Sequence, residues 1–227
     1  MIPWEHLDNA TMPGGGGELR LMRRGAEYSI MAGPIELMNS RLSGSEQALA
    51  TLACAAIGGR PAPHILIGGL GMGFTLRAAQ GVLGAGARLT VAELVPAVAD
   101  WGRGPMADLF AGCLDDPRVD LQVKDVRILI RAAEAAYDAI LLDVDNGPSG
   151  LTRGANDGLY GDGGLREARR ALRPGGVLAV WSATPDDRFV ARLERGGFRV
   201  EEKHVRAGGR GRGARHVIWL ATAPSSG

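Results

Sequence analysis

The chain has 227 residues, of which 45% are hydrophobic and 22% are charged, and its formal net charge is +1. This length and composition predict one globular α/β domain rather than a disordered chain, and the near-neutral charge excludes a strong overall field toward nucleic acid or anionic membrane. The two cysteines and four histidines have no disulfide or metal-ligand spacing, so we expect no metal site. With neither a signal peptide nor an apolar run of about 20 residues, we expect a soluble, cytoplasmic protein.

The N-terminal part differs from the rest of the chain. Residues 1–17 end in PGGGG and have no periodicity, which predicts a flexible stretch. Residues 18–37 alternate apolar and charged positions between glycines, as in a small antiparallel meander. Ser43 and Glu46 have the spacing of a capping box before an Ala/Leu-rich helix. We therefore predict a small N-terminal β-region over residues 1–42.

From residue 43 to residue 227 the pattern predicts a second region, in which strands alternate with helices. The expected strands are 64–67, 88–92, 119–123, 139–142, 177–181, 198–205 and 216–221. The expected helices are 74–83, 95–109, 127–136, 164–172 and 186–195. This alternation predicts a mostly parallel seven-stranded sheet with a terminal antiparallel hairpin, which is the Rossmann-like α/β fold of class I methyltransferases.

Glycines gather in the segment GGLGMG, which follows the first of these strands and precedes a helix. Glycine lets the backbone approach a ligand closely, and a helix N-terminus favours an anionic group. We therefore predict a cofactor-binding loop, and the alternative is a tight turn without a ligand. The predicted cofactor residues of the loop are Gly68, Gly69, Gly71 and Gly73.

Acidic residues end the next two strands. Glu93 stands about 20 residues beyond the loop, where a carboxylate accepts the ribose hydroxyls of a nucleotide cofactor. The alternative for Glu93 is a solvated carboxylate at a helix start. Asp125 is placed to receive an adenine amino group or to cap the following helix, and one carboxylate can do both. We predict that Glu93, Asp125 and the neighbouring Val126 bind the cofactor.

The fourth strand of the alternation ends at Asp143, in the segment ILLDVDNGPSG. Its carboxylate should face the reacting centre, where it could accept a proton from an attacking amine or steer a cation toward a sulfonium. The alternative is turn chemistry, because Asp-Asn-Gly-Pro is a strong turn sequence. We predict that Asp143 and Asp145 are catalytic, that Asp143 also contacts the cofactor, and that Asn146 binds substrate.

With these residues in place, the chain resembles the spermidine synthase-like (polyamine aminopropyltransferase) family of the class I S-adenosylmethionine-dependent superfamily. The resemblance runs from about residue 27 to residue 221. It rests on GGLGMG as the loop, AELVPAVADW as the ribose segment, KDVR as the adenine segment, YDAILLDVDNGP as the catalytic segment and GLYGDGGLREARRALRPGGVLAVW as the helix and strand that follow. It implies S-adenosylmethionine or its decarboxylated form as cofactor, Asp143 as the catalytic aspartate, and a substrate-binding role for Tyr160.

Two positions differ from the family's pattern. Gly71 stands where the family has a loop aspartate that helps to bind the amine of decarboxylated S-adenosylmethionine, and DVDNGP is shorter than the family's substrate segment. An aspartate would repel the carboxylate of intact S-adenosylmethionine, so Gly71 favours the intact cofactor.

We therefore expect a transferase, in first place a methyltransferase that positions a small nucleophile in line with the sulfonium. An aminopropyltransferase with Asp143 as base is the alternative, and a non-catalytic nucleotide-binding module is another. A dehydrogenase fits the acidic strand ends less well. The expected partner is a small-molecule acceptor, with no membrane or nucleic-acid partner, and a homodimer is compatible with the sequence.

Overall fold

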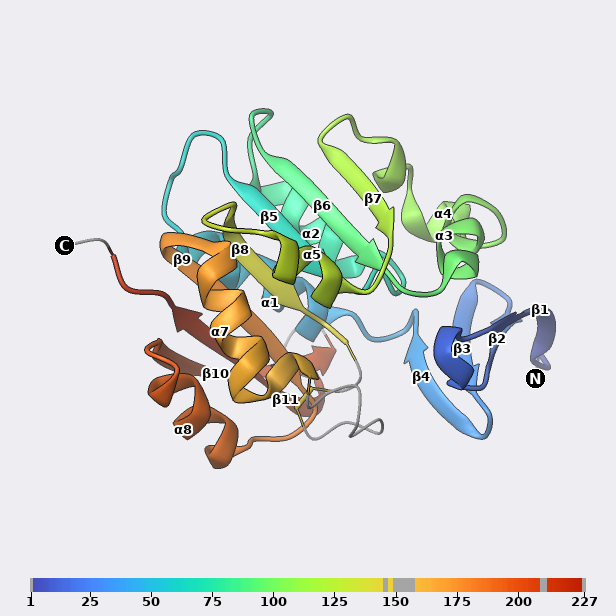
Figure 1. Ribbon diagram of the computed structural model, residues 1–227. Helices are drawn as coiled ribbons and strands as arrows, with labels where there is room; N and C mark the ends of the chain where they lie inside the picture. Colours follow the sequence, from blue (N-terminus) through green and yellow to red (C-terminus); the bar gives the residue numbers. More distant parts are fainter. Residues whose placement is uncertain (1, 145–146, 149–157, 209–211, 226–227) are drawn as a thin grey trace.

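A computed structural model describes residues 2–144, 147–148, 158–208 and 212–225 (Figure 1). The N-terminal elements are β1 (Glu5–Thr11), the 3₁₀ helix η1 (Pro13–Gly15), β2 (Glu18–Arg24), β3 (Glu27–Ala32) and β4 (Ile35–Asn39). The central elements are α1 (Gly44–Ala56), β5 (His64–Gly68), α2 (Phe74–Val82), β6 (Arg88–Glu93), α3 (Pro96–Arg103), α4 (Ala107–Phe110), η2 (Cys113–Asp115), β7 (Val119–Val123), α5 (Val126–Ala132) and β8 (Tyr137–Leu142). The C-terminal elements are α7 (Asp162–Ala171), β9 (Leu172–Ser182), α8 (Asp187–Arg195), β10 (Arg199–Gly208) and β11 (Arg212–Thr222).

The strands form two sheets. The first is an antiparallel meander of four strands in the order β1-β2-β3-β4. The second has seven strands in the order β10-β11-β9-β8-β5-β6-β7, and β11 runs antiparallel to both of its neighbours. The predicted α/β Rossmann-like fold, with its mostly parallel sheet and terminal hairpin, is therefore confirmed.

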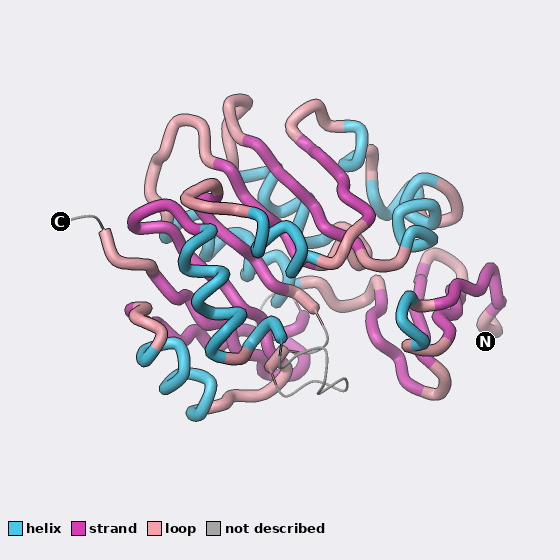
Figure 2. Tube along the Cα trace, in the orientation of Figure 1, coloured by secondary structure: helices cyan, strands magenta, loops and turns pink. Residues whose placement is uncertain are grey.

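The seven-stranded sheet is covered on both faces, because successive side chains of a strand point to opposite sides. Ile65 and Ile67 of β5 pack with α1, α2 and α3, whereas Leu66 packs with α5 and α7 on the opposite face. Figure 2 shows α5 and α7 in front of the sheet, with α1 and α2 behind it. Strands buried on both faces explain why the sequence of β8, YDAILL, is almost continuously apolar.

The four-stranded sheet packs against the same core. Leu19, Leu21 and Ile30 are buried in the cluster that contains helix α1 and one face of the large sheet. The Tyr28 hydroxyl donates to the carbonyl oxygen of Pro105 over 2.7 Å, and the Trp101 indole nitrogen donates to Asp8 over 2.7 Å. The predicted boundary near residue 42 falls between the two sheets, but the division into two domains stays a prediction.

Several local predictions were wrong. Residues 5–11 form β1, because pairing with β2 supplies the backbone partners that their own sequence pattern does not reveal. The expected helix 95–109 is interrupted between α3 and α4, where Gly104 and Pro105 end the first helical segment. The capping box at the start of α1 does not form: the Ser43 side chain makes no cap hydrogen bond, and Glu46 points elsewhere.

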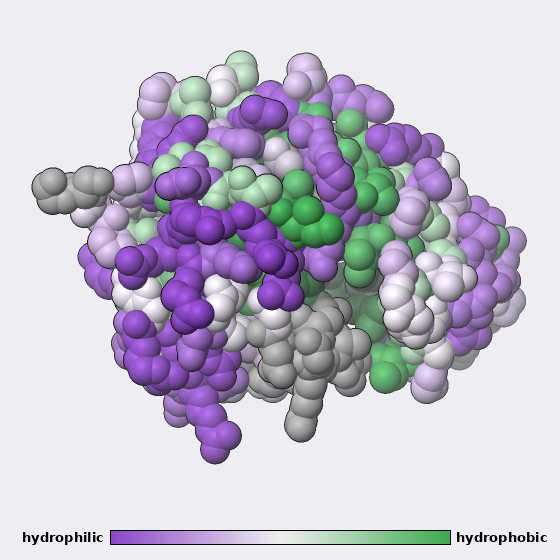
Figure 3. Space-filling model, in the orientation of Figure 1, coloured by the Kyte–Doolittle hydropathy of each residue, from purple (hydrophilic) through white to green (hydrophobic). Residues whose placement is uncertain are grey.

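Part of the surface is strongly hydrophilic. Figure 3 shows hydrophilic side chains gathered over α7 and α8. The arginines of these two helices are Arg166, Arg169, Arg170, Arg188, Arg192 and Arg195. Within the described residues, no helix is both long and apolar enough to cross a membrane.

Candidate active site

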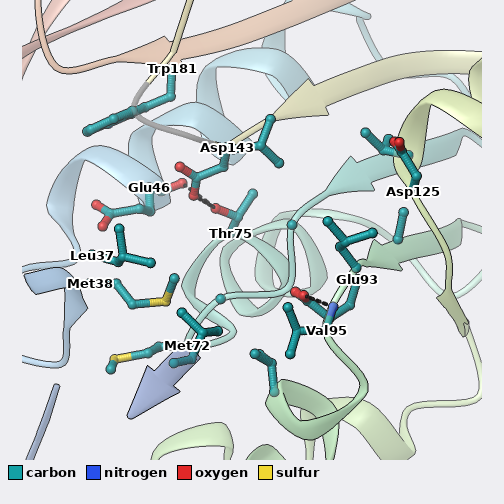
Figure 4. A pocket seen from close by; sticks show the side chains of 18 of the residues that line it. Leu37, Met38, Glu46, Met72, Thr75, Glu93, Val95, Asp125, Asp143 and Trp181 are labelled. Atoms are coloured by element: carbon teal, nitrogen blue, oxygen red, sulfur yellow. Dashed lines mark hydrogen bonds between the residues drawn. The ribbon is translucent and has the colours of Figure 1, made fainter. Parts of the chain in front are cut away.

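The candidate site is a cavity of about 390 Å³ at the carboxyl ends of β5, β6, β7 and β8. Open α/β sheets bind ligands at this edge, beside the strand where the strand order reverses, which is β5 here. The N-terminal sheet and α1 close the other side of the cavity (Figure 4). The polar and charged residues that line it are Asn39, Glu46, Thr75, Glu93, Lys124, Asp125, Arg127 and Asp143.

The glycine-rich loop brings the backbone of β5 against that of β8. Gly69 has a φ of +87°, and a Cβ there would lie 2.7 Å from the carbonyl oxygen of Asp143. Gly71 has a φ of +52°, and both residues line the cavity. Gly68 and Gly73 are not among the lining residues; a Cβ at these positions would press on Leu142 and Phe110. Two of the four predicted loop residues therefore face the cavity, and two permit close packing behind it.

Glu93 ends β6 with its side chain buried. Its Oε2 accepts from the backbone N–H of Leu70 over 2.9 Å, and its Oε1 accepts from that of Val95 over 2.8 Å. Burial raises the pKa of Glu93, and these backbone hydrogen bonds oppose the rise. Each carboxylate oxygen keeps a second lone pair, so Glu93 can hold the loop and still accept a hydrogen bond from a ligand hydroxyl.

Asp125 precedes α5 and has two functions in the fold. Its side chain accepts from the backbone N–H of Arg127 over 2.8 Å, which is an N-cap contact, and it also lines the cavity. Val126, the next residue, lines the cavity as well and lies against Gly68. The structure thus places Glu93, Asp125 and Val126 in the lining of one cavity, and their binding of a cofactor stays a prediction.

Asp143 directly follows β8 and points into the cavity (Figure 4). The Thr75 hydroxyl donates to its Oδ2 over 3.1 Å. Burial is the main cause that raises the pKa of Asp143 to about 7, the negative charge of Glu46 adds to the rise, and the Thr75 hydrogen bond opposes it. A carboxyl group with such a pKa can take up a proton near neutral pH.

Glu46 is a site residue that the sequence patterns did not reveal. Its spacing from Ser43 indicated a capping box, but its carboxylate lies in the cavity near Asp143, Leu37 and Met38 (Figure 4). Burial raises its pKa. The signal in the sequence was an acidic residue in an otherwise Ala/Leu-rich helix, and only the position of α1 against the cavity reveals its setting.

The remaining predicted site residues are Asp145, Asn146 and Tyr160. Asp145 and Asn146 lie outside the described residues. Tyr160 is buried beneath α8, edge-on to Phe189, and is not among the residues that line the cavity. Trp181 does line it, and its indole nitrogen is buried without a hydrogen-bond partner among the described residues. The described residues contain no group of three or more His, Cys, Asp or Glu side chains that could hold a metal ion.

No family model matches the chain. The polyamine aminopropyltransferase of Mycobacterium tuberculosis H37Rv is 32% identical over 122 residues, which are 50% of this chain and 23% of that protein. The polyamine aminopropyltransferase of Nitrosomonas europaea is 34% identical over 110 residues, which are 47% of this chain and 32% of that protein. The matched region thus spans about a third or less of these curated relatives.

Solved structures match nearly the whole chain. A spermidine synthase in complex with the transition state analogue AdoDATO has a TM-score of 0.74 at 15% identity, over 97% of this chain and 73% of its own. The spermidine synthase from Thermotoga maritima has a TM-score of 0.72 at 16% identity, over 97% of this chain and 74% of its own. The predicted resemblance to the spermidine synthase-like family is confirmed, and the TM-scores show that the fold is shared.

These relatives support a transferase but correct the finer prediction. The methyltransferase hypothesis and its intact S-adenosylmethionine are wrong by this comparison, since the curated relatives are named aminopropyltransferases. The physical reason is that the hypothesis considered Gly71 alone. Because the Glu46 carboxylate lines the same cavity, a glycine in the loop does not free this space of negative charge for a donor carboxylate.

Proposed function

We propose that this chain is an aminopropyltransferase, which moves the aminopropyl group of decarboxylated S-adenosylmethionine to a small amine acceptor. The observation that carries the proposal is the position of Asp143, whose carboxylate points into the cavity that Glu93 and Asp125 also line. A candidate base and two carboxylates suited to binding a nucleoside thus line the same cavity. The names of the curated relatives favour this chemistry over other uses of the fold.

The cavity suits the nucleoside part of such a donor. Glu93 has lone pairs left for the ribose hydroxyls, and Asp125 is available to an adenine amino group beside Val126. Apolar side chains supply a wall on which the adenine and the alkyl chain of the donor can pack. These side chains are Met12, Leu37, Met38, Met72, Val95 and Leu159. The donor therefore meets both polar anchors and apolar walls, which is the usual composition of a small-molecule site.

Asp143 supplies the proton chemistry in this proposal. The donor needs no further activation, because the positive charge on its sulfonium sulfur makes methylthioadenosine a good leaving group. The acceptor nitrogen bonds to the aminopropyl carbon next to sulfur, the carbon–sulfur bond breaks, and its electron pair stays on sulfur in neutral methylthioadenosine. Asp143 takes the proton that the acceptor nitrogen loses, and Thr75 holds the carboxylate in place.

The test is a transfer assay with the purified protein, decarboxylated S-adenosylmethionine and putrescine or a related amine. We expect methylthioadenosine and an aminopropylated amine in equal amounts. The Glu93→Ala variant should lose both, because removing hydrogen bonds to a charged acceptor costs about 1.5–3 kcal/mol of nucleoside affinity. Absence of methylthioadenosine with every amine tested, although the wild-type protein is folded, would exclude the proposed reaction.

A further inference from the structure

Among the described residues, four carboxylates line the cavity, and two of them accept hydrogen bonds from the backbone. Glu93 accepts two backbone N–H groups, and Asp125 caps α5. Glu46 and Asp143 also line the cavity, and Figure 4 shows the Glu46 carboxylate near Leu37 and the Asp143 carboxylate beside Thr75. Asp143 acts as a base in the proposed reaction, whereas Glu46 has no role in it so far.

The Glu46 carboxylate is held by a chain of polar contacts that passes through a buried serine. The Ser45 hydroxyl donates to Glu46 Oε2 over 2.7 Å, and Ser45 is completely buried. The ring nitrogen Nδ1 of His216 lies 3.0 Å from the same hydroxyl. Because the Ser45 hydrogen is used toward Glu46, the His216 Nδ1–H must be the donor to the Ser45 oxygen. Among the described side chains, Ser45 is the donor to Glu46, and it contacts Oε2, so Oε1 can accept a hydrogen bond from a ligand.

The two carboxylates are close enough for the charge of Glu46 to act on Asp143. The basic side chains that line the cavity are Lys124, which follows β7, and Arg127, which belongs to α5; neither comes from α1 or β8. The negative charges of Glu46 and Asp143 therefore have no cationic side chain beside them among the described lining residues. Two partly desolvated carboxylates in this position are stabilised by a cation from the ligand.

We propose that Glu46 is a substrate-binding residue that holds the primary ammonium of the donor's aminopropyl group. Its neighbours agree with this role, since Gly71 brings no side chain to the cavity, and Leu37 and Met38 of β4 offer apolar contacts for a short alkyl chain. Asp143 remains free to receive the acceptor nitrogen. The inference rests on the proposed function, because it names the part of the donor that Glu46 recognises.

Calorimetry separates the charged tail from the nucleoside. Decarboxylated S-adenosylmethionine carries the ammonium, whereas methylthioadenosine shares its nucleoside and lacks the aminopropyl group. In Glu46→Gln we expect the Kd for decarboxylated S-adenosylmethionine to rise at least tenfold and the Kd for methylthioadenosine to change less than twofold. Glu46→Asp, which keeps the charge, should recover part of the lost affinity. Glu194→Gln, an exposed change on α8, is the matched control and should alter neither Kd.

The outcomes distinguish the inference from the proposed function. Equal affinity of wild type and Glu46→Gln for decarboxylated S-adenosylmethionine would overturn the role of Glu46, even if transfer occurs. A parallel loss for both ligands would also overturn it, since Glu46 would then support the cavity as a whole. A higher KM for the acceptor amine with an unchanged donor Kd would move Glu46 to the acceptor and overturn the assignment. If the wild-type protein binds neither nucleoside, the proposed function itself fails.

Discussion

The Asp143 carboxyl group lies in a setting that disfavours its charge. Burial and the nearby Glu46 raise its pKa to about 7, against an unfolded value of about 3.9. The folded protein therefore binds this proton more tightly than the unfolded chain does. It follows that this group's contribution to stability is most favourable below pH 4 and is lost as the pH rises through about 7.

Asp143→Asn removes this pH-dependent cost. Above pH 7 we expect the variant to exceed the wild type in free energy of unfolding by about 2 kcal/mol, a figure reduced for solvent screening. The difference should shrink steadily as the pH falls from 7 to 5. Urea denaturation across pH 5 to 8 measures it. A difference that does not vary with pH would mean that Asp143 is not buried in its charged form.

The same variant links this cost to function. Because the carboxylate faces the acceptor rather than the nucleoside, Asp143→Asn should bind methylthioadenosine about as well as the wild type and lose most turnover. If Asp143 is catalytic, the Asp143→Asn variant should be more stable than the wild type, bind the nucleoside and be inactive. Normal turnover would reduce Asp143 to a structural residue.

At the residue scale, the sequence was informative wherever a side chain's setting followed from its place on a strand. Glu93, Asp125 and Asp143 lie at the carboxyl ends of β6, β7 and β8, so the parallel fold predicts that they line one cavity. Glu46 precedes these strands on a helix, and its spacing from Ser43 imitated a capping box. Its approach to the cavity depends on tertiary packing of α1, which no local pattern encodes.

At the scale of elements, Asp138 connects three strands of the large sheet. It lies in β8 with a side chain that is 1% exposed, and it pairs with Arg60 just before β5 and with Arg173 of β9. The contact between Arg173 and Asp138 is 2.6 Å, and the backbone N–H of His64 donates to Asp138 over 2.7 Å. These contacts fix the ends of the strands opposite to the cavity.

Asp138→Asn should therefore destabilise the sheet without changing the site. The amide keeps one acceptor but loses its charge, so one partner loses its hydrogen bond, at a cost of about 1–3 kcal/mol. Glu134→Gln, an exposed neutral substitution in the loop before β8, is the matched control. Thermal unfolding should show a lower Tm for Asp138→Asn alone, with methylthioadenosine affinity unchanged below the transition. An equal Tm in both variants would show that the arginine pairs contribute nothing to stability.

Elements were predictable where burial imposes a strong pattern. The strands of the large sheet follow apolar runs, and the terminal hairpin was expected because no helix separates its strands. By contrast, β1 has largely exposed positions, so its sequence, EHLDNAT, has no clear alternation. Its strand conformation comes from pairing with β2, which is a contact between segments rather than a property of either one.

At the scale of the whole molecule, the two sheets share one hydrophobic core. Leu19, Leu21 and Ile30 belong to the cluster formed by α1, α2 and one face of the large sheet. The N-terminal sheet also supplies part of the cavity wall through Leu19. The sequence predicts a boundary at residue 42 from a change of pattern, but a pattern within segments does not tell whether the two regions can fold separately.

The shared core predicts that residues 43–227 do not fold well alone. The truncation removes Leu19, Leu21 and Ile30 from the core. Burying one large aliphatic side chain stabilises a protein by about 1.5–3 kcal/mol, so the loss of all three approaches the whole stability of a typical domain. We expect the truncated chain to precipitate or to unfold without a cooperative transition. In the full chain, Leu21→Ala should lower stability by about 2–5 kcal/mol, because Leu21 is 0% exposed. Ile35→Ala, at a 44% exposed position of the same sheet, is the control and should change stability by less than about 1 kcal/mol. Cooperative unfolding of residues 43–227 near the Tm of the full chain, with methylthioadenosine still bound, would instead establish an independent domain.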